Sequence, residues 1–282
     1  MRVLLVRPPG GGAVIEVREL YELEDLYEVY RLIDAIWHPD PGAEPVQVEL
    51  LRALSHAGNY VAGAYQDGRL VGMSIAFLAA PPGVSLHSHM TGARAGRGIG
   101  MALKLHQRRW ALDRGLSRIT WTYDPLVSRN AHFNLVKLGA RPVEYLASFY
   151  GAMDDSINSG DETDRVLAAW PLADPRVVAA AAGRAVQAGV PAGAVAALSD
   201  HDGRPVPGTT NAPALLVAVP QDIEGLRRRD PEAARAWRVA LRDVLGGLLD
   251  EGARVTGFHR RSCYVVEREP IERGFNHAKG SS

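Results

Sequence analysis

The sequence predicts an α+β fold, in which a mixed central sheet is flanked by helices and a second, smaller α/β region follows. Strand-like and helix-like segments alternate over residues 14–149. A glycine-dense turn joins one of these strands directly to a helix, and a polar stretch, Asp154–Asp164, has the composition of a linker or a long surface loop. We therefore expect one domain over residues 1–154 and an α/β region over residues 155–282.

Each element of the first domain follows from a periodic pattern and a start or stop signal. Alternation predicts the opening strand, and one apolar helical face that ends at Trp37 predicts the first helix. Pro45 and Gly58 bound the second helix, and Asp67-Gly68 between two strand-like runs is a strong hairpin signal. Gly115 is a natural end for the third helix. The predicted elements are the strand Val14–Leu20, the helices Asp25–Trp37 and Val46–His56, the strands Tyr60–Tyr65, Leu70–Leu78 and Val84–Met90, the helix Met101–Arg114, the strand Arg118–Tyr123, the helix Asn130–Leu138 and the strand Val143–Phe149.

The second region has a predicted β-α-β-α-β-β order, which suits a reduced copy of the first domain or an extension of its sheet. Asp230-Pro231-Glu232 supplies a cap, a first-turn proline and an acidic residue at the start of a helix. Arg227-Arg228-Arg229 is a candidate anion clamp, although such a run is usually a solvated approach to a helix. The predicted elements are the strand Arg165–Leu172, the helix Pro175–Ala188, the strand Ala214–Val219, a helix from Asp230 to Gly252, and a hairpin of Val255–Phe258 and Tyr264–Glu267.

Composition excludes several classes of function. Lys and Arg number 32, as do Asp and Glu, so the basic excess typical of a nucleic-acid partner is absent. The apolar runs are too short to span a bilayer, and no cleavage site precedes Pro8-Pro9-Gly10, so we expect neither a membrane segment nor a signal peptide. The single cysteine, Cys263, excludes an internal disulfide and an all-cysteine metal site. These features predict a cytoplasmic protein.

The turn Gly92–Gly100 is the most informative motif. Its glycines let backbone N–H groups approach an anion, and the unpaired amides and dipole of the following helix add to the attraction. Arg94 and Arg97 add formal charge. No Gly-Lys-Ser/Thr follows, as in a Walker loop, and no acidic residue lies at a ribose-binding distance. The turn therefore suits the phosphate of some other cofactor, although it would also serve as a simple tight turn.

The order of the elements, with this turn between the fourth strand and the third helix, resembles the GNAT superfamily of acyl-coenzyme A dependent N-acyltransferases over residues 14–154. Arg129–Ala140 is similar to the family's asparagine-containing helix. In that family the fourth and fifth strands, here Val84–Met90 and Arg118–Tyr123, splay apart around the pantetheine arm, and the turn cradles the pyrophosphate. The resemblance implies acyl-coenzyme A as the cofactor, held by Met90, Arg94, Gly96, Arg97, Gly98, Ile99, Gly100, Asn130 and Asn134. An N-cap is the alternative role of Asn130.

Three features depart from the family's pattern. Ala95 stands where the turn normally has Gln or Arg, and the segment between Met90 and Gly96 is short and lacks the usual Pro-Glu. Leu135 falls at the place of the tyrosine that often protonates the departing thiolate. Because leucine cannot donate a proton, another group is the acid, or the thiolate leaves unassisted, or the scaffold performs different chemistry.

Three residues are predicted to be catalytic. Acyl transfer needs a neutral amine and hence a base. His87 and His89 share one face of a strand by its period of two, and a histidine pKa near ~6.5 suits a base near neutral pH. Asp124 could orient a histidine, hold a substrate ammonium or act as the base. The alternatives are half-buried strand histidines held by hydrogen bonds and, for Asp124, a turn residue before Pro125.

The acceptor pocket is predicted to include Trp37 and His38, which fall in the loop that covers it in the family, together with Trp121 and Tyr123. A core position at the end of a proline-terminated helix is the alternative for Trp37. The paired histidines and Asp124 could also suggest a metal, but no compact ligand spacing accompanies them, so we expect none.

The sequence thus predicts an acyltransferase that moves an acetyl or succinyl group from acyl-coenzyme A to an amine of a small metabolite or amino acid. His87-Ser88-His89-Met90, Trp121–Leu126 and Phe133-Asn134-Leu135 resemble a bacterial subgroup of acetyltransferases, one branch of which is associated with N-succinylation of amino acids. Direct attack is expected, because Cys263 shows no setting that would activate a thiol. The alternatives are a different acid/base reaction on the same scaffold and a non-catalytic ligand-binding module. The second region could supply a wall of the acceptor site or a homodimer surface.

Overall fold

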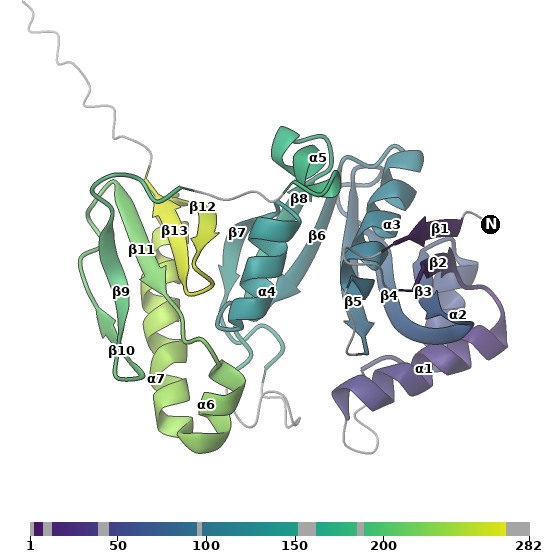
Figure 1. Cartoon of the computed structure of the whole chain (residues 1–282), viewed down its shortest axis with the longest axis horizontal. Coiled ribbons are helices and arrows are strands. Elements are labelled where there is room, and N and C mark those ends of the chain that lie inside the picture. The colour runs from purple at the N-terminus through teal and green to yellow at the C-terminus, as the bar shows by residue number, and fades with distance from the viewer. Residues whose placement is uncertain are drawn as a thin grey trace, which may run out of the picture.

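Two sheets make up the computed structural model, which describes residues 3–7, 13–38, 45–94, 98–151, 162–184 and 189–268 (Figure 1). The strands of the larger sheet are β1 Val3–Val6, β2 Ile15–Glu19, β3 Tyr60–Gln66, β4 Arg69–Ala79, β5 Ser85–Ala93, β6 Arg118–Tyr123, β7 Arg141–Leu146 and β8 Arg165–Pro171. They lie in the order β1-β2-β3-β4-β5-β6-β8-β7. With its flanking helices and a second, smaller sheet, the architecture confirms the predicted fold class.

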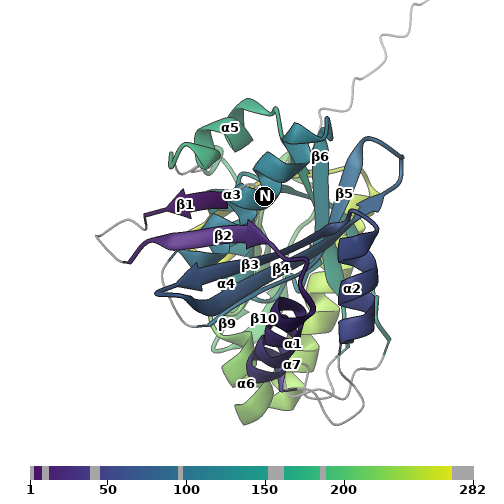
Figure 2. The same cartoon turned by 90° about the vertical axis from the view of Figure 1, so that its right-hand side faces the viewer.

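Helices cover both faces of the larger sheet. They are α1 Leu23–Trp37, α2 Val48–His56, α3 Ile99–Asp113, α4 Ser128–His132 and a π-helical turn, η1, Phe133–Lys137. Alternating residues of β4 serve the two faces: Met73 and Ile75 pack with the buried residues of α1 and α2, whereas Ser74 accepts a hydrogen bond from Gln107 of α3. α1 and α2 therefore lie on one face and α3 on the other (Figure 2).

The pairing between β5 and β6 is parallel and short. It begins with Ser85 opposite Arg118 and ends with His87 opposite Thr120, although both strands continue beyond these residues. The other neighbouring strands of this sheet, as far as it is described, are antiparallel. Beyond His87 and Thr120 the two central strands diverge, as the resemblance to the GNAT superfamily implies.

Some local predictions for the first domain are wrong. The structure adds β1, which pairs along its whole length with β2 and is too short for its alternation to be diagnostic. The helix predicted over Asn130–Leu138 begins at Ser128 and changes to a π-helical turn at Phe133. The strand predicted over Val143–Phe149 ends at Leu146, because Ser148 has a φ of 46° and its N–H donates to Asp164.

Strand β8 lies between β6 and β7 in the larger sheet, although it follows the expected boundary at residue 154. Thr163 and Asp164, expected to belong to a linker or surface loop, are fully buried, and Tyr145 donates to the Asp164 carboxylate at 2.8 Å. Residues 152–161, which form most of that predicted stretch, lie outside the described residues. The chain after residue 161 therefore completes the larger sheet before it enters the smaller one.

The smaller sheet has the order β10-β9-β11-β13-β12. Its strands are β9 Val195–His201, β10 Arg204–Pro207, β11 Ala214–Ala218, β12 Arg254–His259 and β13 Cys263–Glu267, and its helical segments are α6 Ile223–Arg229, α7 Pro231–Leu241, η2 Arg242–Gly246 and α8 Gly247–Asp250. The short helix α5 Pro175–Ala181 follows β8 and lies over the end of the larger sheet (Figure 1). The cap predicted at Asp230 is confirmed, since its carboxylate accepts from the N–H of Ala233 at 2.9 Å. The hairpin β9–β10 turns at Asp202-Gly203, a signal that the sequence prediction missed.

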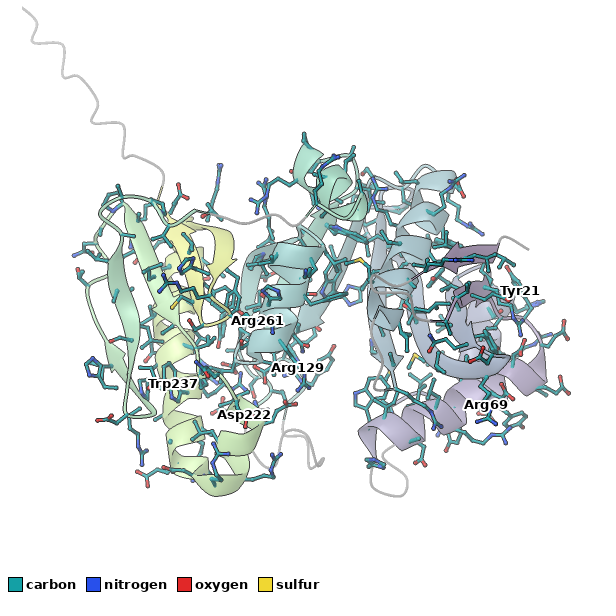
Figure 3. The ribbon with its side chains drawn as sticks, viewed as in Figure 1. Tyr21, Arg69, Arg129, Asp222, Trp237 and Arg261 are labelled. Atoms are coloured by element: carbon teal, nitrogen blue, oxygen red, sulfur yellow. The ribbon has the colours of Figure 1, made fainter. Side chains whose placement is uncertain are left out.

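The two sheets are joined by polar contacts around α4. Arg129 of α4 forms an ion pair with Glu224 of α6, and Ser128 donates to the backbone carbonyl of Arg261 between β12 and β13. Arg129 and Arg261 lie at the border between the sheets, whereas Tyr21 and Arg69 lie at the end of the larger sheet farthest from the smaller one (Figure 3). No helix in the described part of the chain is long and apolar enough to cross a membrane.

Candidate active site

The divergence of β5 and β6 opens a gap in the centre of the larger sheet. The last pair joins His87 of β5 to Thr120 of β6. Ser88 and Trp121 are the next residues of the two strands, and they do not pair with each other. From Ser88 onward the edge of β5 that faces away from β4 has no paired strand among the described residues. Its N–H and C=O groups are therefore available to hydrogen-bond a bound chain that carries amides.

A register shift places an extra residue in β5 at this gap. Ala76 lies opposite Ser88 and Ile75 lies opposite Met90, so His89 is the unpaired residue of a β-bulge. Bulges redirect side chains and are frequent beside active sites. The bulge accordingly turns His89 relative to its neighbours near the closed end of the gap, where the strands separate.

The N-terminus of α3 lies just after the end of β5. Gly98 is the residue before the helix, with a φ of 89°, a conformation that costs a side-chain-bearing residue about 1 kcal/mol or more. The first hydrogen bond of the helix joins the N–H of Ala102 to the carbonyl of Gly98, so the amides of Ile99 and Gly100 have no intrahelical partner. Arg94 is exposed at the end of β5. Gly96 and Arg97, also predicted to bind the cofactor, lie outside the described residues.

His87 and His89 share the sheet face that carries α1 and α2. Both rings lie beside Phe77 of β4, with centroid distances of 5.3 and 6.0 Å. The Nδ1 atom of His87 is 3.1 Å from the hydroxyl of Thr120 across the last β5–β6 pair. Burial lowers the pKa of both histidines, and for His87 the neighbouring His89 and Lys104 lower it further. Both imidazoles are therefore neutral at pH 7 and able to accept a proton.

The residues predicted to cover the acceptor lie further along the same face. Trp37, the last residue of α1, packs on β5, since a Cβ atom at Gly92 would lie 2.3 Å from its ring. His38 follows with a φ of 45° and caps the helix through its backbone N–H. Met90 packs with the buried residues beneath α1 and α2. Trp37 is thus partly buried and lies against β5 at Gly92.

The opposite face of the gap holds a buried lysine that the sequence prediction missed. The Nζ atom of Lys104 donates to Ser88 Oγ at 2.9 Å and to Gln107 Oε1 at 3.2 Å, and it lies 4.1 Å from the ring centre of Trp121. Lys104 is 4% exposed, and burial lowers its pKa to about 7. The helical spacing from Lys104 to Gln107 and to buried Ala111 was the available signal, because it places the lysine on the buried face of α3.

Asp124 does not have the surroundings of a general base. Arg238 makes two hydrogen bonds to its carboxylate, at 2.8 and 2.9 Å, and Arg227 makes a third at 2.6 Å. Burial alone would raise the pKa of Asp124, but the two guanidiniums outweigh it and hold the pKa well below its ordinary value. Asp124 therefore stays ionised and joins β6 to α6 and α7. Arg227, expected to be solvated, is buried, whereas Arg228 and Arg229 are exposed.

The remaining predicted residues divide between the core and the gap. Trp121 and Tyr123 are buried; Trp121 contacts Lys104 and Trp170, so its side chain lies on the α3 side and not among the histidines. Asn130 is exposed, and Asn134 is buried in η1. η1 lies beside the start of α3, where Gly100 faces the ring of Phe133.

Tyr150 adds a hydroxyl group on the histidine side of β6. Its oxygen lies 3.1 Å from the hydroxyl of Thr122, which shares a strand face with Thr120. Tyr150 packs on Phe149, and both rings are exposed. The sequence placed Phe149 in a strand and gave no signal for Tyr150, because its position depends on the turn that Asp164 stabilises.

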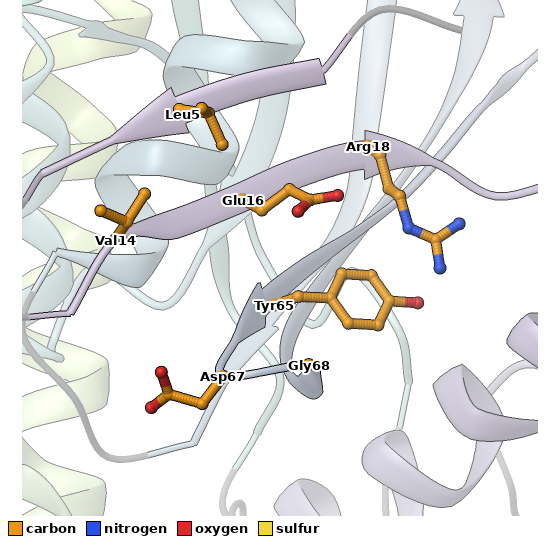
Figure 4. A pocket seen from close by; sticks show the side chains of 7 residues that line it. All are labelled: Leu5, Val14, Glu16, Arg18, Tyr65, Asp67 and Gly68. Carbon is orange, nitrogen blue, oxygen red and sulfur yellow. The ribbon is translucent and has the colours of Figure 1, made fainter.

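A separate hollow of about 320 Å³ lies at the other end of the sheet. It is lined by Leu5, Val14, Glu16, Arg18, Tyr65, Asp67 and Gly68 (Figure 4). None of the predicted site residues lines it, and its arginine is already paired with Asp25. Among the described residues no group of three or more His, Cys, Asp or Glu side chains could hold a metal ion.

No protein-family model and no curated protein matches the sequence. Solved structures similar to this chain include an N-acetyltransferase from Staphylococcus aureus Mu50, at 15% identity and a TM-score of 0.47, covering 56% of this chain and 98% of that one. Mycobacterium smegmatis RimJ in complex with CoA-disulfide is 22% identical, with a TM-score of 0.49, over 66% of this chain and 96% of its own. An acetyltransferase of the GNAT family from Streptococcus pneumoniae is 16% identical, with a TM-score of 0.45, over 55% and 98%. Likenesses this remote do not define an activity, an acyl group or an acceptor for this chain.

Proposed function

We propose that the protein is an acyltransferase that passes an acyl group from acyl-coenzyme A to the amine of a small metabolite or amino acid. The observation that carries this proposal is the early end of the β5–β6 pairing, at His87 and Thr120, beside the N-terminus of α3. An open strand edge suits the amides of a pantetheine arm, and unpaired helix amides suit a pyrophosphate. Both parts of the cofactor thus have matching donor groups in adjacent elements.

Each of these groups has a distinct role. The backbone of β5 from His89 to Ala93 would hold the pantetheine arm, and the amides of Ile99 and Gly100 would hold the pyrophosphate, with Asn134 beside them. The bound cofactor supplies an acyl group activated as a thioester. On the α1 side, His87 or His89 accepts the proton that the acceptor amine loses, because both imidazoles are neutral at pH 7.

The acceptor would approach from the face that carries Phe77, Thr122 and Tyr150. Exposed aromatic rings and two hydroxyl groups flank this side of the gap, and they suit an amine that also has an apolar portion. An acetyl or a succinyl group, a cytoplasmic location and a homodimer, each expected from the sequence, stay predictions. So does the division of the chain at residue 154.

The proposal is tested by calorimetric titration of the protein with acetyl-, succinyl- and free coenzyme A. We expect binding in the micromolar range, on the order of 8 kcal/mol, with the acyl groups ranked by affinity. In Gly98→Val a side chain at positive φ distorts the start of α3, so affinity should fall at least tenfold. The matched control is Gly115→Val, which introduces the same kind of strain at the other end of α3, where φ is 74°.

Two results would count against the proposal. The absence of binding to all three compounds would favour a different reaction on this scaffold. Equal loss of affinity in Gly98→Val and Gly115→Val would show that general destabilisation, and not the turn, is responsible. Release of free thiol during incubation with a panel of primary amines then identifies the acceptor.

A further inference from the structure

The ammonium group of Lys104 lies at the closed end of the gap, on the face opposite the two histidines. Its partners Ser88 and Trp121 are the first residues of β5 and β6 that no longer pair with each other, so Nζ lies on the α3 face at the point where the two strands separate. The donation to Ser88 and the position over the Trp121 ring therefore fix the lysine at the same place from both strands.

The surroundings of Nζ match the protonated form of the side chain. An ammonium has three donors and no acceptor, and Lys104 meets two oxygen acceptors and the face of one aromatic ring. The orientation of the Gln107 amide supports this arrangement, because its Nε2 donates to Ser74 Oγ at 3.2 Å and leaves Oε1 for the lysine. A hydrogen bond between Ser74 and Thr91 extends the network along β5.

No carboxylate forms an ion pair with Lys104 in the part of the chain that the structure describes. A buried cation without a counter-ion gives up its proton more readily than a solvated one, and burial lowers the pKa of Lys104 to about 7. Of the groups around Nζ, the serine, the glutamine and the tryptophan do not titrate near neutral pH. His87 of β5 is the titratable neighbour that interacts with it electrostatically.

We propose that Lys104 is a catalytic residue that donates a proton to the departing thiolate of coenzyme A. This assignment rests on the proposed acyltransferase function, and it supplies the acid that Leu135 cannot provide. As the acceptor nitrogen bonds to the acyl carbon, the carbon–sulfur bond breaks and its electron pair stays on sulfur. Sulfur takes one proton from Nζ to become a thiol, and the proton lost by the amine passes to His87 or His89. Lys104 then regains a proton from solvent.

The placement of acid and base on opposite faces of the sheet supports this assignment. The histidines lie on the α1 side, where the amine would arrive, and Lys104 lies on the α3 side, toward which the sulfur would leave. The histidines and Lys104 thus lie at the same gap between β5 and β6, on its two faces. Separated groups of this kind can remain in opposite protonation states at one pH.

The first test measures the pKa of the thiol of bound, unacylated coenzyme A. The absorbance of the thiolate is followed as the pH is raised. In the wild-type protein Nζ and the thiol should share the loss of one proton, so a fraction of the thiolate appears near pH 7, at least one pH unit below the ordinary thiol pKa of about 8.5. Lys104→Met retains the length of the side chain and removes its charge, and the shift should disappear. Desulfo-coenzyme A is the matched control, because Lys104→Met should weaken coenzyme A binding but not that of the compound without the thiol.

The second test separates catalysis from packing by kinetics. Lys104→Met should lower kcat on the order of 100-fold with little change in the KM for the acyl-coenzyme A. Identical thiolate titrations in wild-type and variant complexes, or an unchanged kcat, would overturn the role of Lys104 and leave the proposed function standing. Failure of the wild-type protein to bind coenzyme A would overturn both.

Discussion

Replacing Lys104 with methionine should change the way in which stability depends on pH. Burial lowers the pKa of this lysine from 10.5 to about 7, which corresponds to a destabilisation of the ammonium of about 5 kcal/mol. Between pH 7 and 10 the unfolded chain holds this proton and the folded chain does not, so the free energy of unfolding of the wild type rises with pH. The slope approaches about 1.4 kcal/mol per pH unit above pH 8, which gives a rise of roughly 2 kcal/mol between pH 7 and 9. Lys104→Met lacks this contribution.

The assay is urea unfolding of the wild type and Lys104→Met at pH 6, 7, 8 and 9. The hydrogen bonds to Ser88 and Gln107 that the variant loses lower its free energy of unfolding by a roughly constant amount at every pH. The informative quantity is therefore the difference in free energy of unfolding between the two proteins as a function of pH. That difference should be nearly level below pH 7 and then move by about 2 kcal/mol in favour of the wild type by pH 9. Lys137→Met, which removes an exposed lysine, is the control and should show no such change. A constant difference from pH 7 to 9 would refute the reasoning, because it would mean that the three partners of Nζ fully compensate its burial.

Two further predictions concern the carboxylate and the histidines. Asp124→Asn should lower the free energy of unfolding by about 3–5 kcal/mol in thermal or urea denaturation, because Arg227 and Arg238 are left buried without their shared carboxylate. Because the pKa of Asp124 is depressed in the folded state, its contribution to the free energy of unfolding is present above pH 4 and is lost only as the pH falls toward the folded pKa. Loss of activity in Asp124→Asn with unchanged stability would instead indicate that Asp124 takes part in catalysis. For the histidines, kcat/KM should decline as the pH falls below 6.5, and His87→Gln or His89→Gln, whichever is the base, should abolish this acid limb. A decline that persists in both variants would place the base elsewhere.

Local patterns determined most of the elements, including the strand and the helix on either side of the glycine-dense turn. The strand at Arg118–Tyr123 has the predicted limits, and the hairpin at Asp67-Gly68 and the cap at Asp230 formed as their residues imply. These features depend on neighbours within a few residues, since turn and capping preferences come from the φ angles and hydrogen bonds of the residues themselves. The alternation that placed His87 and His89 on one face is local in the same sense.

Tertiary structure decided the contacts that assign roles to charged side chains. Asp124 is a turn residue, as its sequence position indicates, since its carboxylate accepts from the N–H of Leu126. That it cannot serve as a base is decided only when Arg227 and Arg238, 103 and 114 residues later, reach the carboxylate. Lys104 is one polar position on a helix until Ser88 and Trp121 enclose it, and β8 joins the larger sheet only because β6 and β7 leave a place between them. The pKa of a group is set by its desolvation and by charges within a few ångströms. Those neighbours are brought together by folding, so the sequence could indicate which residues are able to carry the chemistry, while the packing of distant segments determined which of them are placed to do so.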